Sequence, residues 1–511
     1  MRTIFALLAL GVTACGPEKD DTGDGPEADA DTDTDADSDT DTDGDTDVGP
    51  GDGCEEGSIP EAWPETIDEV EVHIPWGGHN AALGDVNGDG YDDIALDDAL
   101  VLLGPLCPDD DTYDTSDIFA DLAAPSGYAY QTLNGAGDVD GDGLADLLVG
   151  DEGELDHTGT AFLVQSPALG DVQVAEVAVA EIVGEDIHSH LGRTVAGVGD
   201  VDGDGIPDLL VGAVHQEDDG AAWLIPGTTR GTHSVGEVGV AIRGSEAYFM
   251  VGEHLAALGD TDGDGLDDFL VGTSTQQDYS SVALFRGPIA ADRDFADADA
   301  LFLPSPEAIM GDAFGSGISS AGDQDGDGLP DIAIGAACAT IAADEDGAVY
   351  IFQSTSSGVF DASQARSVLG GESEYDEAGS SVALAGDVNG DGQPDLCVGA
   401  PGWDPEDRSR GAVYVFFGPV SEGYQSLTDA SVRLEGTYDG AHPDLGNEVT
   451  GVGDTNGDGL DDVLVRGWLE DLSESYYHSH LLLGREYNYF KRQGVLLQRP
   501  SLRLTSPFTS F

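Results

Sequence analysis

Basic residues are scarce in this sequence. Its 511 residues include 17 lysines and arginines against 102 aspartates and glutamates, which gives a formal net charge of −85. A surface this acidic repels nucleic-acid phosphates and anionic lipids, so we expect no nucleic-acid partner; it favours metal ions, basic proteins or basic sugars. Methionine is also rare, with 3 residues, whereas glycine contributes 73. This composition favours tight turns and short strands over long helices.

The sequence also lacks an apolar run that could span a bilayer as a helix. Its N-terminus, MRTIFALLALGVTAC, has one positive charge at Arg2 and an apolar stretch over 4–12, which is typical of an export signal. The VTAC end resembles the lipobox of bacterial lipoproteins, which implies cleavage after residue 14 and a lipid on Cys15. An ordinary secretory signal with nearby cleavage is the alternative.

We therefore expect a signal peptide at 1–14 and a lipid anchor as the only attachment to a membrane. Gly16 follows the cysteine, where an aspartate would resemble an inner-membrane retention signal. This favours the outer membrane or the cell surface of a Gram-negative cell.

The segment that follows Cys15 is rich in aspartate. DADTDTDADSDTDTDGDTD, at 29–47, alternates aspartate with small residues and has no large apolar side chain. It cannot bury enough surface to offset its ordering entropy, and its charges repel one another. We expect 15–66 to be a disordered linker that holds a folded head away from the membrane. Calcium binding by this segment is a second interpretation, less favoured than a solvated spacer.

The chain has only five cysteines. If Cys15 carries lipid, four remain. Cys54 and Cys107 lie outside the regular strand pattern and could form a disulfide in an oxidising compartment. Cys397 lies inside an apolar strand and Cys338 just after one, so we expect both to be buried free thiols.

One pattern, D-x-[DN]-G-D-G-x-x-D, dominates the rest of the chain. It occurs seven times, 53 to 67 residues apart, and each copy follows a glycine. A short run of small or β-branched residues precedes it and an apolar run follows it. Two further apolar segments come before the next copy. Four short strands in each unit of about sixty residues are typical of propeller blades. The copies start at Asp85, Asp138, Asp200, Asp260, Asp323, Asp387 and Asp454.

We label the strands of a unit A (before the motif), B (after it), C and D, and predict an all-β propeller over 67–484 with a basic tail at 485–511. Strand A is rich in small residues, as the crowded axis of a propeller requires; Ala81, Ala256 and Ala383 are examples. The N-terminal strand around 69–76 is the favoured strand D of the last blade, because it keeps the repeat order and removes an exposed edge. A strand at 501–507 is the competing candidate.

The aspartates of the motif indicate a calcium site between strands A and B. Several carboxylates can lie this close together only if a cation neutralises them, and Ca²⁺ accepts six to eight oxygens in irregular geometry. Positions 1, 3, 5 and 9 supply side chains, position 7 supplies a carbonyl, and the glycines at 4 and 6 allow sharp turns. Plain surface turns are the alternative, but a turn does not need four acids in register. The motif lacks the glutamate and the flanking helices of an EF-hand.

We therefore predict up to seven structural Ca²⁺ ions. Their ligands are Asp85, Asn87, Asp89, Tyr91 and Asp93; Asp138, Asp140, Asp142, Leu144 and Asp146; Asp200, Asp202, Asp204, Ile206 and Asp208; Asp260, Asp262, Asp264, Leu266 and Asp268; Asp323, Asp325, Asp327, Leu329 and Asp331; Asp387, Asn389, Asp391, Gln393 and Asp395; and Asp454, Asn456, Asp458, Leu460 and Asp462.

The units resemble FG-GAP repeats, the blades of the integrin α-chain propeller. FG stands at 314–315 and GAP at 399–401, and the glycine of FG recurs eight residues before the motif in six units. The second unit departs from this pattern, with Tyr130 there. The resemblance covers about residues 67–484 and implies a seven-bladed β-propeller with calcium-binding A–B loops.

Three functions remain open at this level. The first is a cell-surface binding or adhesion module for a protein or carbohydrate ligand. The second is an extracellular hydrolase or lyase on a propeller scaffold, although the sequence has no G-x-S-x-G elbow, Walker loop or dinucleotide fingerprint. The pairs His188/His190 and His478/His480 are more often surface residues than zinc ligands, since no cysteine or glutamate completes a motif. The third is a passive calcium-binding surface protein. We favour the first, and expect a monomer.

The ligand is expected on the face opposite the calcium loops. A–B and C–D turns lie on one face of a blade, and B–C and D–A turns lie on the other. Trp76, Trp403 and Trp468 fall on the latter, and exposed aromatic rings rimmed by acids suit a sugar or a cationic protein patch. The alternative is that these rings cap the ends of the blades.

Overall fold

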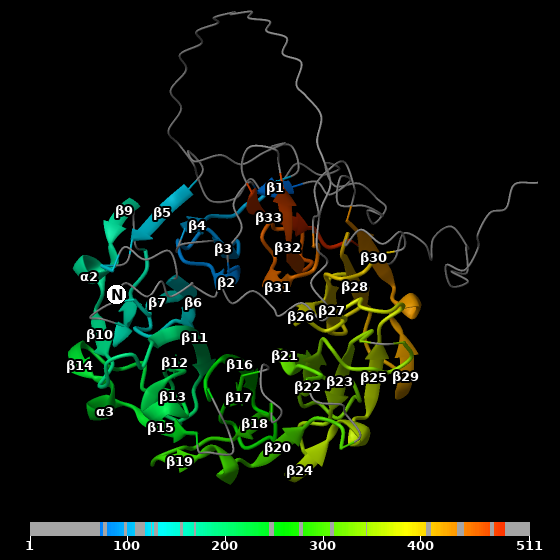
Figure 1. The fold of residues 1–511 in the computed structure, drawn as a ribbon. Coiled ribbons are helices and arrows are strands. Elements are labelled where there is room, and N and C mark those ends of the chain that lie inside the picture. Colours follow the sequence, from blue (N-terminus) through cyan, green and yellow to red (C-terminus); the bar gives the residue numbers. More distant parts are fainter. Residues whose placement is uncertain are drawn as a thin grey trace, which may run out of the picture.

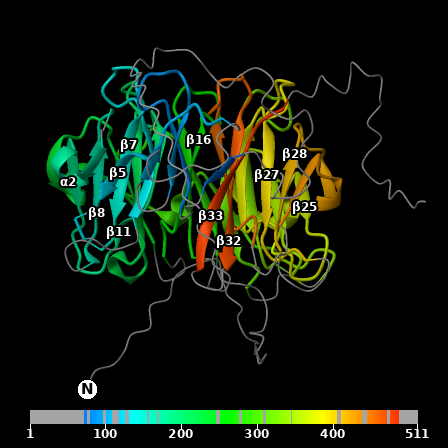
Figure 2. The ribbon, with the colours of Figure 1, turned by 90° about the horizontal axis from the view of Figure 1, so that it is seen from above.

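Seven sheets are arranged radially around a central axis (Figure 1). The computed structural model describes residues 72–485 apart from gaps at 75–78, 97–99, 108–117, 124, 127–130, 154–156, 168–169, 245–249, 275–279, 307–310, 344, 405–409, 437–443 and 471–474. Seen at right angles to the first view, the strands span the thickness of a disc (Figure 2). The predicted seven-bladed, all-β propeller is confirmed.

Each blade places its strands in the order A, B, C, D from the axis outward. Blades 1 to 3 are β2 (Ala81–Gly84), β3 (Asp93–Leu96), β4 (Leu100–Leu102) and β5 (Ile118–Ala123); β6 (Gln131–Gly137), β7 (Asp146–Asp151), β8 (Thr160–Val164) and β10 (Ala180–Val183); β11 (Leu191–Gly199), β12 (Asp208–Ala213), β13 (Ala221–Ile225) and β15 (Val240–Arg243). Blades 4 and 5 are β16 (His254–Gly259), β17 (Asp268–Gly272), β18 (Val282–Phe285) and β20 (Ala300–Leu303); β21 (Phe314–Gly322), β22 (Asp331–Ala336), β23 (Ala348–Phe352) and β25 (Ser367–Gly370). Blades 6 and 7 are β26 (Ser381–Gly386), β27 (Asp395–Ala400), β28 (Ala412–Phe416) and β30 (Val432–Glu435); β31 (Glu448–Gly453), β32 (Asp462–Glu470), β33 (Ser475–Leu482) and β1 (Val72–Ile74).

Strands B and C form the cores between blades. Every residue of β12 and of β13 is buried, so these strands read as continuous apolar runs rather than as alternating ones. The reason is that both faces of a blade pack against neighbouring blades. Trp223 on β13, for example, contributes to the core between the second and third blades.

Five sheets gain a fifth strand that the sequence did not predict. The segment between strands C and D of one blade runs parallel to strand D of the preceding blade; Gly231 pairs with Ala180, for instance. This covers the outer edge of the preceding sheet. The added strands are β9 (Gly170–Gln173), β14 (Gly231–Ser234), β19 (Arg293–Asp294), β24 (Gly358–Asp361) and β29 (Gly423–Ser426). Each leads into a short helical turn: α2 (Val174–Val177), α3 (Val235–Val238), η4 (Phe295–Asp297), η5 (Ala362–Gln364) and η6 (Leu427–Asp429).

The N-terminal strand closes the ring, as expected. β1 pairs antiparallel with β33, with Val72 opposite Leu481 and Ile74 opposite Ser479. The backbone N–H of Asn80 also donates to Glu448 Oε1 over 3.0 Å, which joins the A strands of the first and last blades. The competing strand at 501–507 lies outside the described residues.

Adjacent blades meet through glycines. A methyl group on Gly399, in strand B of the sixth blade, would lie 1.9 Å from the carbonyl oxygen of Gly446, at the start of the seventh. The same contact joins Gly335 to Gly379 at 2.0 Å. The two glycines of each pair therefore allow one backbone to lie directly against the next, which a side chain would prevent.

The division of the cysteines into free thiols and disulfides differs from the one expected from the sequence. Cys397 is a buried free thiol, as predicted. Cys338 was expected to be free but is disulfide-bonded. It lies half-buried in the turn after β22, where its side chain is not enclosed within a strand. Cys107 is also disulfide-bonded. Its expected partner, Cys54, lies outside the described residues, so that pairing stays a prediction.

The helical segments among the described residues are short turns of three or four residues, η3 (Gln216–Asp218) included. None of these helices has the length and hydropathy that a bilayer crossing requires. Residues 1–71 and 486–511, which hold the predicted signal peptide, the whole predicted linker and nearly all of the tail, lie outside the described part.

The glycine contacts can be tested with two matched substitutions. Gly446 and Gly423 have φ of 92° and 95°, but a methyl group would lie 2.5 Å from the Ala412 carbonyl oxygen at the former and meet nothing within 4 Å at the latter. We expect Gly423→Ala to cost about 1–2 kcal/mol of unfolding free energy from backbone strain. Gly446→Ala should cost a further ~1–3 kcal/mol from the clash. Equal losses in chemical denaturation would contradict the proposed role of blade contact.

Candidate metal centres and the opposite face

The first aspartate of each motif holds the A–B turn together. In the second blade, Asp138 Oδ1 accepts hydrogen bonds from the N–H groups of Gly141 (2.6 Å) and Asp142 (3.1 Å), and Oδ2 accepts one from Gly143 (2.9 Å). Gly141 and Gly143 have φ of 81° and 95°. Residues with side chains rarely adopt this region, so both glycines are needed for the backbone to wrap around the carboxylate.

The same geometry recurs in every blade. The glycine at position 6 donates to the position 1 carboxylate over 2.8–2.9 Å in all seven turns. The N–H of position 7 donates to the position 5 carboxylate over 2.9–3.0 Å, again in all seven. The register that the sequence predicts for the motif is therefore the register of the structure.

The ninth residue begins strand B and is buried. Its carboxylate accepts the N–H of position 2 over 2.8–3.1 Å in all seven blades. In six blades it also accepts, over 2.8–3.3 Å, the N–H of a residue that follows strand C. This carboxylate therefore ties the A–B turn to the C–D turn on one face of the disc. The residues are Asp93, Asp146, Asp208, Asp268, Asp331, Asp395 and Asp462, which expose 0–1% of their surface.

Burial raises the pKa of these carboxyl groups. The pKa reaches about 7 in Asp395 and about 8 in Asp462. The nearby loop carboxylates act in the same direction, whereas hydrogen bonds from Asn389 or Thr455 and from backbone N–H groups act in the opposite one. A nearby cation would favour the ionised form of each group.

In four turns the carboxylates converge closely enough to share one cation. Three carboxylate oxygens lie within 4.8 Å of one another in each. Two oxygens bound to the same Ca²⁺ at 2.3–2.6 Å are at most about 5 Å apart, so these donor sets fit the ion. The groups are Asp138, Asp140 and Asp146; Asp200, Asp202 and Asp208; Asp260, Asp262 and Asp264; and Asp323, Asp325 and Asp331.

Among these four turns, only the fourth has its predicted position 5 ligand in the cluster. In the fourth turn Asp264 replaces the buried Asp268, whose Oδ2 accepts the hydroxyl of Thr261. Arg286 Nε also lies 3.7 Å from Asp262 Oδ2 there. This turn already holds a positive charge, which would compete with a cation.

The other three turns have asparagine at position 3, and thus one carboxylate fewer. In the sixth turn Asn389 Nδ2 donates to both oxygens of Asp395, over 3.0 and 2.8 Å. Asn389 Oδ1 is buried without a hydrogen-bond partner. A buried carbonyl oxygen of this kind is a group that a cation would satisfy, so the donors of the sixth turn also fit Ca²⁺.

Neighbouring turns contact one another. The position 8 N–H of one blade donates to the position 1 carbonyl of the preceding blade in four cases, among them Asp92 to Asp454 over 3.1 Å and Asp267 to Asp200 over 3.0 Å. The carboxylates of Asp92 and Asp267 also accept the N–H of these partners, over 3.0 and 2.8 Å. A change in one turn therefore acts directly on its neighbour.

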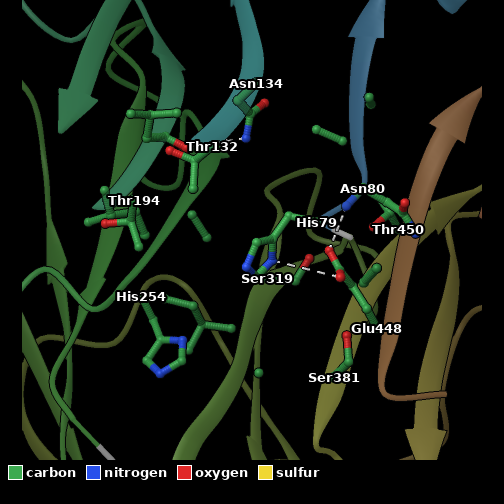
Figure 3. Close-up of a pocket in the computed structure, with 18 of the residues that line it drawn as sticks. His79, Asn80, Thr132, Asn134, Thr194, His254, Ser319, Ser381, Glu448 and Thr450 are labelled. Atoms are coloured by element: carbon green, nitrogen blue, oxygen red, sulfur yellow. Dashed lines mark hydrogen bonds and ion pairs between the residues drawn. The ribbon is translucent and has the colours of Figure 1, made fainter. Parts of the chain in front are cut away.

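A channel lined by both polar and apolar side chains opens on the opposite face, where the B–C and D–A turns lie. It has a volume of about 690 Å³ and is lined by the A strands (Figure 3). The small residues predicted for strand A, such as Ala81, Ala256 and Ala383, line it as expected. Hydroxyl groups link adjacent A strands: Thr132 Oγ1 donates to the Gly192 carbonyl (2.9 Å) and Thr194 Oγ1 to that of Gly252 (2.6 Å).

In six of the seven blades, the residue six positions before the motif contributes a polar side chain to this channel, so that these residues form a ring. These are His79, Thr132, Thr194, His254, Ser381 and Glu448. His79 points toward Glu448, with Nδ1 3.8 Å from Oε2, as Figure 3 shows. This ring was not predicted from the sequence, although an alignment of the seven units by their motifs places its residues at one position.

Trp403 is not an exposed ligand-binding ring, which corrects the expectation. It exposes only 4% of its surface. The Arg433 guanidinium lies 5.2 Å from its ring centre, and its indole N–H donates to Glu372 Oε2 over 3.4 Å. The loop folds back onto the core between blades 5 and 6, so the packing alternative describes Trp403. Trp76 and the side chain of Trp468 lie outside the description. Tyr375, on the same face, is 38% exposed.

Charged side chains border the channel mouth between the second and third blades. Glu152 Oε2 lies 2.9 Å from Arg193 Nη1 and 3.3 Å from His190 Nδ1. Burial raises the pKa of Glu152, but His190 and Arg193 outweigh it and the net shift is downward. His190 was expected to be a surface residue, since no cysteine or glutamate completes a zinc motif near it in the sequence. Glu152 was missed because it is distant in sequence.

Comparisons with known proteins agree with this geometry. A model of the FG-GAP repeat matches residues 191–225 and 378–416, which are strands A to C of the third and sixth blades. The chain is 31% identical to integrin alpha-4 of Xenopus laevis over 162 residues, 30% of this chain and 15% of that protein. It is 32% identical to integrin alpha-IIb of Homo sapiens over 199 residues, which are 35% of this chain and 19% of that protein. The match thus covers less than a fifth of these relatives.

Among solved structures, the chain is similar to a mutant of the Aleuria aurantia lectin in complex with alpha-methyl-L-fucoside. The two share 12% identity over 70% of this chain and 95% of that chain, with a TM-score of 0.36. From the repeat match, the integrin relatives and the seven sheets together, the chain carries FG-GAP repeats in an integrin α-like, seven-bladed β-propeller.

Proposed function

We propose that this protein is an exported, calcium-stabilised propeller that binds a protein or carbohydrate ligand on the face opposite its calcium turns. The observation that carries the proposal is the structural difference between the two faces of the disc. One face holds converging carboxylates in regular turns. The other holds a channel mouth with mixed charges and irregular loops.

Support for calcium comes from the chemistry of the donors. Twenty-five of the 28 expected side-chain ligands are aspartates and three are asparagines, so every one offers the hard oxygen that Ca²⁺ prefers. The carboxylates would bind the ion, and the glycines and backbone N–H groups would hold them in place. When bound, the ion would supply positive charge that relieves the repulsion among them.

Support for a binding module comes from the fold and the open face. Loops on a rigid scaffold are common sites of recognition, and the channel mouth offers both acidic and basic groups within reach of one ligand. The integrin relatives make cell-surface binding a reasonable function to test here. The export signal and the lipid on Cys15 stay sequence-based parts of the proposal.

Calcium should raise the melting temperature. For each site, a Ca²⁺ concentration ten times the dissociation constant adds about 1.4 kcal/mol to the free energy of unfolding. With dissociation constants of about 10⁻⁴–10⁻³ M, as in extracellular modules, millimolar calcium should shift the melt strongly. The measurement is calorimetry in calcium and in chelator at matched ionic strength. Superimposable curves would refute structural calcium.

Asp142→Asn should reverse its effect between these two conditions. The amide keeps the oxygen that accepts the Leu144 N–H but removes one negative charge from the second turn. Without calcium, the variant should be as stable as the parent or slightly more so, because repulsion falls. With calcium it should be less stable, because the site weakens. Asp294→Asn, an exposed change of the same charge on β19, is the control and should show no such reversal.

Cys15→Ala should release the protein from membranes. The lipid on this cysteine is the predicted anchor, and its loss removes the apolar chains that hold the protein to the bilayer. Fractionation of cells expressing each form, followed by immunoblotting, measures the shift from membrane to soluble fractions. If the variant stays in the membrane fraction, the anchor lies elsewhere.

Two exposed tyrosines test which surface binds the ligand. Tyr375 lies in the D–A loop before β26, on the channel face, whereas Tyr424 lies on the outer strand β29 and is 54% exposed. A ligand found on a glycan array or by pull-down of surface proteins should bind Tyr375→Ala at least several-fold more weakly and Tyr424→Ala normally. Loss with Tyr424→Ala alone would move the binding surface to the rim, and the absence of any ligand would favour a passive structural role.

A further inference from the structure

Four histidines meet where the second blade joins the third. Figure 1 shows these two blades side by side, with β6 to β10 next to β11 to β15. His157 lies in the turn before β8, His188 and His190 lie in the loop between β10 and β11, and His215 lies in the turn after β12. The ring centre of His190 is 5.1 Å from that of His157 and 5.1 Å from that of His215. The ring centre of His188 is 6.0 Å from that of His157. All four lie on the face opposite the calcium turns.

The backbone holds the three segments together. The N–H of His190 donates to the His157 carbonyl over 3.1 Å, and the N–H of His215 donates to the Ser189 carbonyl over 3.2 Å. Ser189 Oγ donates to the Thr158 carbonyl over 2.8 Å. The loop between β10 and β11 is thus fastened to both blades. The imidazoles are near one another before any ligand binds, which lowers the entropic cost of binding.

A carboxylate lies beside the central imidazole. Glu152 Oε2 lies 3.3 Å from His190 Nδ1, and Arg193 Nη1 holds the same oxygen over 2.9 Å. A carboxylate beside one ring nitrogen of histidine fixes the ring and makes the other nitrogen a better ligand, as commonly happens at metal sites. This leaves His190 Nε2 as the nitrogen available for a ligand.

The histidines are particular to this junction, whereas the backbone is not. His190 has a φ of 56°. The corresponding residues of later junctions, ten before each motif, also have positive φ: Met250 (54°), Ala313 (52°), Glu377 (56°) and Asp444 (32°). None of these four residues is a histidine. The repeat therefore supplies the loop conformation, and this one junction fills it with imidazole.

We propose that His157, His188, His190 and His215 form a binding site for a divalent transition-metal ion such as Zn²⁺, Cu²⁺ or Ni²⁺. Imidazole nitrogen suits these ions, whereas carboxylate oxygen suits calcium. Two imidazoles bound to one ion at about 2.0–2.1 Å and a tetrahedral angle have ring centres roughly 5 Å apart. The two separations of 5.1 Å from His190 fall in that range, and the 6.0 Å between His188 and His157 lies about 1 Å beyond it. His188 and His215 are exposed, so rotation of their side chains completes the site without movement of the backbone.

The test is metal binding by the full-length protein in excess calcium, which keeps the aspartate turns occupied. Calorimetric titration with Zn²⁺ should show one binding event per molecule. Electron paramagnetic resonance of the Cu²⁺ form should show nitrogen couplings. The double substitution His157→Gln/His190→Gln should weaken Zn²⁺ binding by about 10–100-fold or more and remove those couplings.

Two further variants guard against misfolding and nonspecific effects in this test. His188→Gln/His215→Gln changes exposed side chains only, so it should fold normally and still weaken the site. His233→Gln is the matched control, since His233 on β14 also has a nearby carboxylate, with Nδ1 3.8 Å from Glu237 Oε2, but stands apart from the cluster. The proposal is overturned if Zn²⁺ does not bind in calcium, or if both double variants, folded by circular dichroism, bind it as the parent does. Loss of binding in His233→Gln would likewise overturn it.

Discussion

The close approach of one blade's backbone to the next is the constraint on which the rest of the structure depends. A methyl group on Gly399 would lie 1.9 Å from the Gly446 carbonyl oxygen, and similar glycine pairs recur around the ring. At this separation, seven blades close with hydroxyl and backbone hydrogen bonds between A strands. The channel, the contact between neighbouring aspartate turns and the fastening of the His190 loop to two blades all follow from it.

The two faces of the disc differ because their turns make different hydrogen bonds. The A–B turns repeat one set of hydrogen bonds around the position 1 carboxylate, and the buried aspartate at position 9 joins them to the C–D turns. Regular turns of this kind leave little room for variation. The B–C and D–A turns carry no such motif, so their side chains differ from junction to junction, and this face can hold a mixed-charge channel mouth and a histidine cluster.

Much of the fold was predictable from the sequence, and so was the register of the aspartate turns. The spacing of the repeat gave seven blades, small residues marked strand A, and the favoured closing strand is the one observed. Three features were not predictable. The fifth strands pair with a preceding blade, Cys338 is disulfide-bonded, and Trp403 folds into the core, and each depends on contacts with residues distant in the chain.

The sequence by itself determined whatever is local and repeated. A turn of nine residues contains its own hydrogen-bond partners, so D-x-[DN]-G-D-G-x-x-D specifies its geometry wherever it occurs. Only the tertiary structure decided what lies between blades. Glu152 meets His190 across a junction, as His157 and His215 do, because ring closure brings together turns that no local pattern relates. Side chains at a junction pack against two blades, and the sequence of a single repeat carries no information about its neighbour's loops.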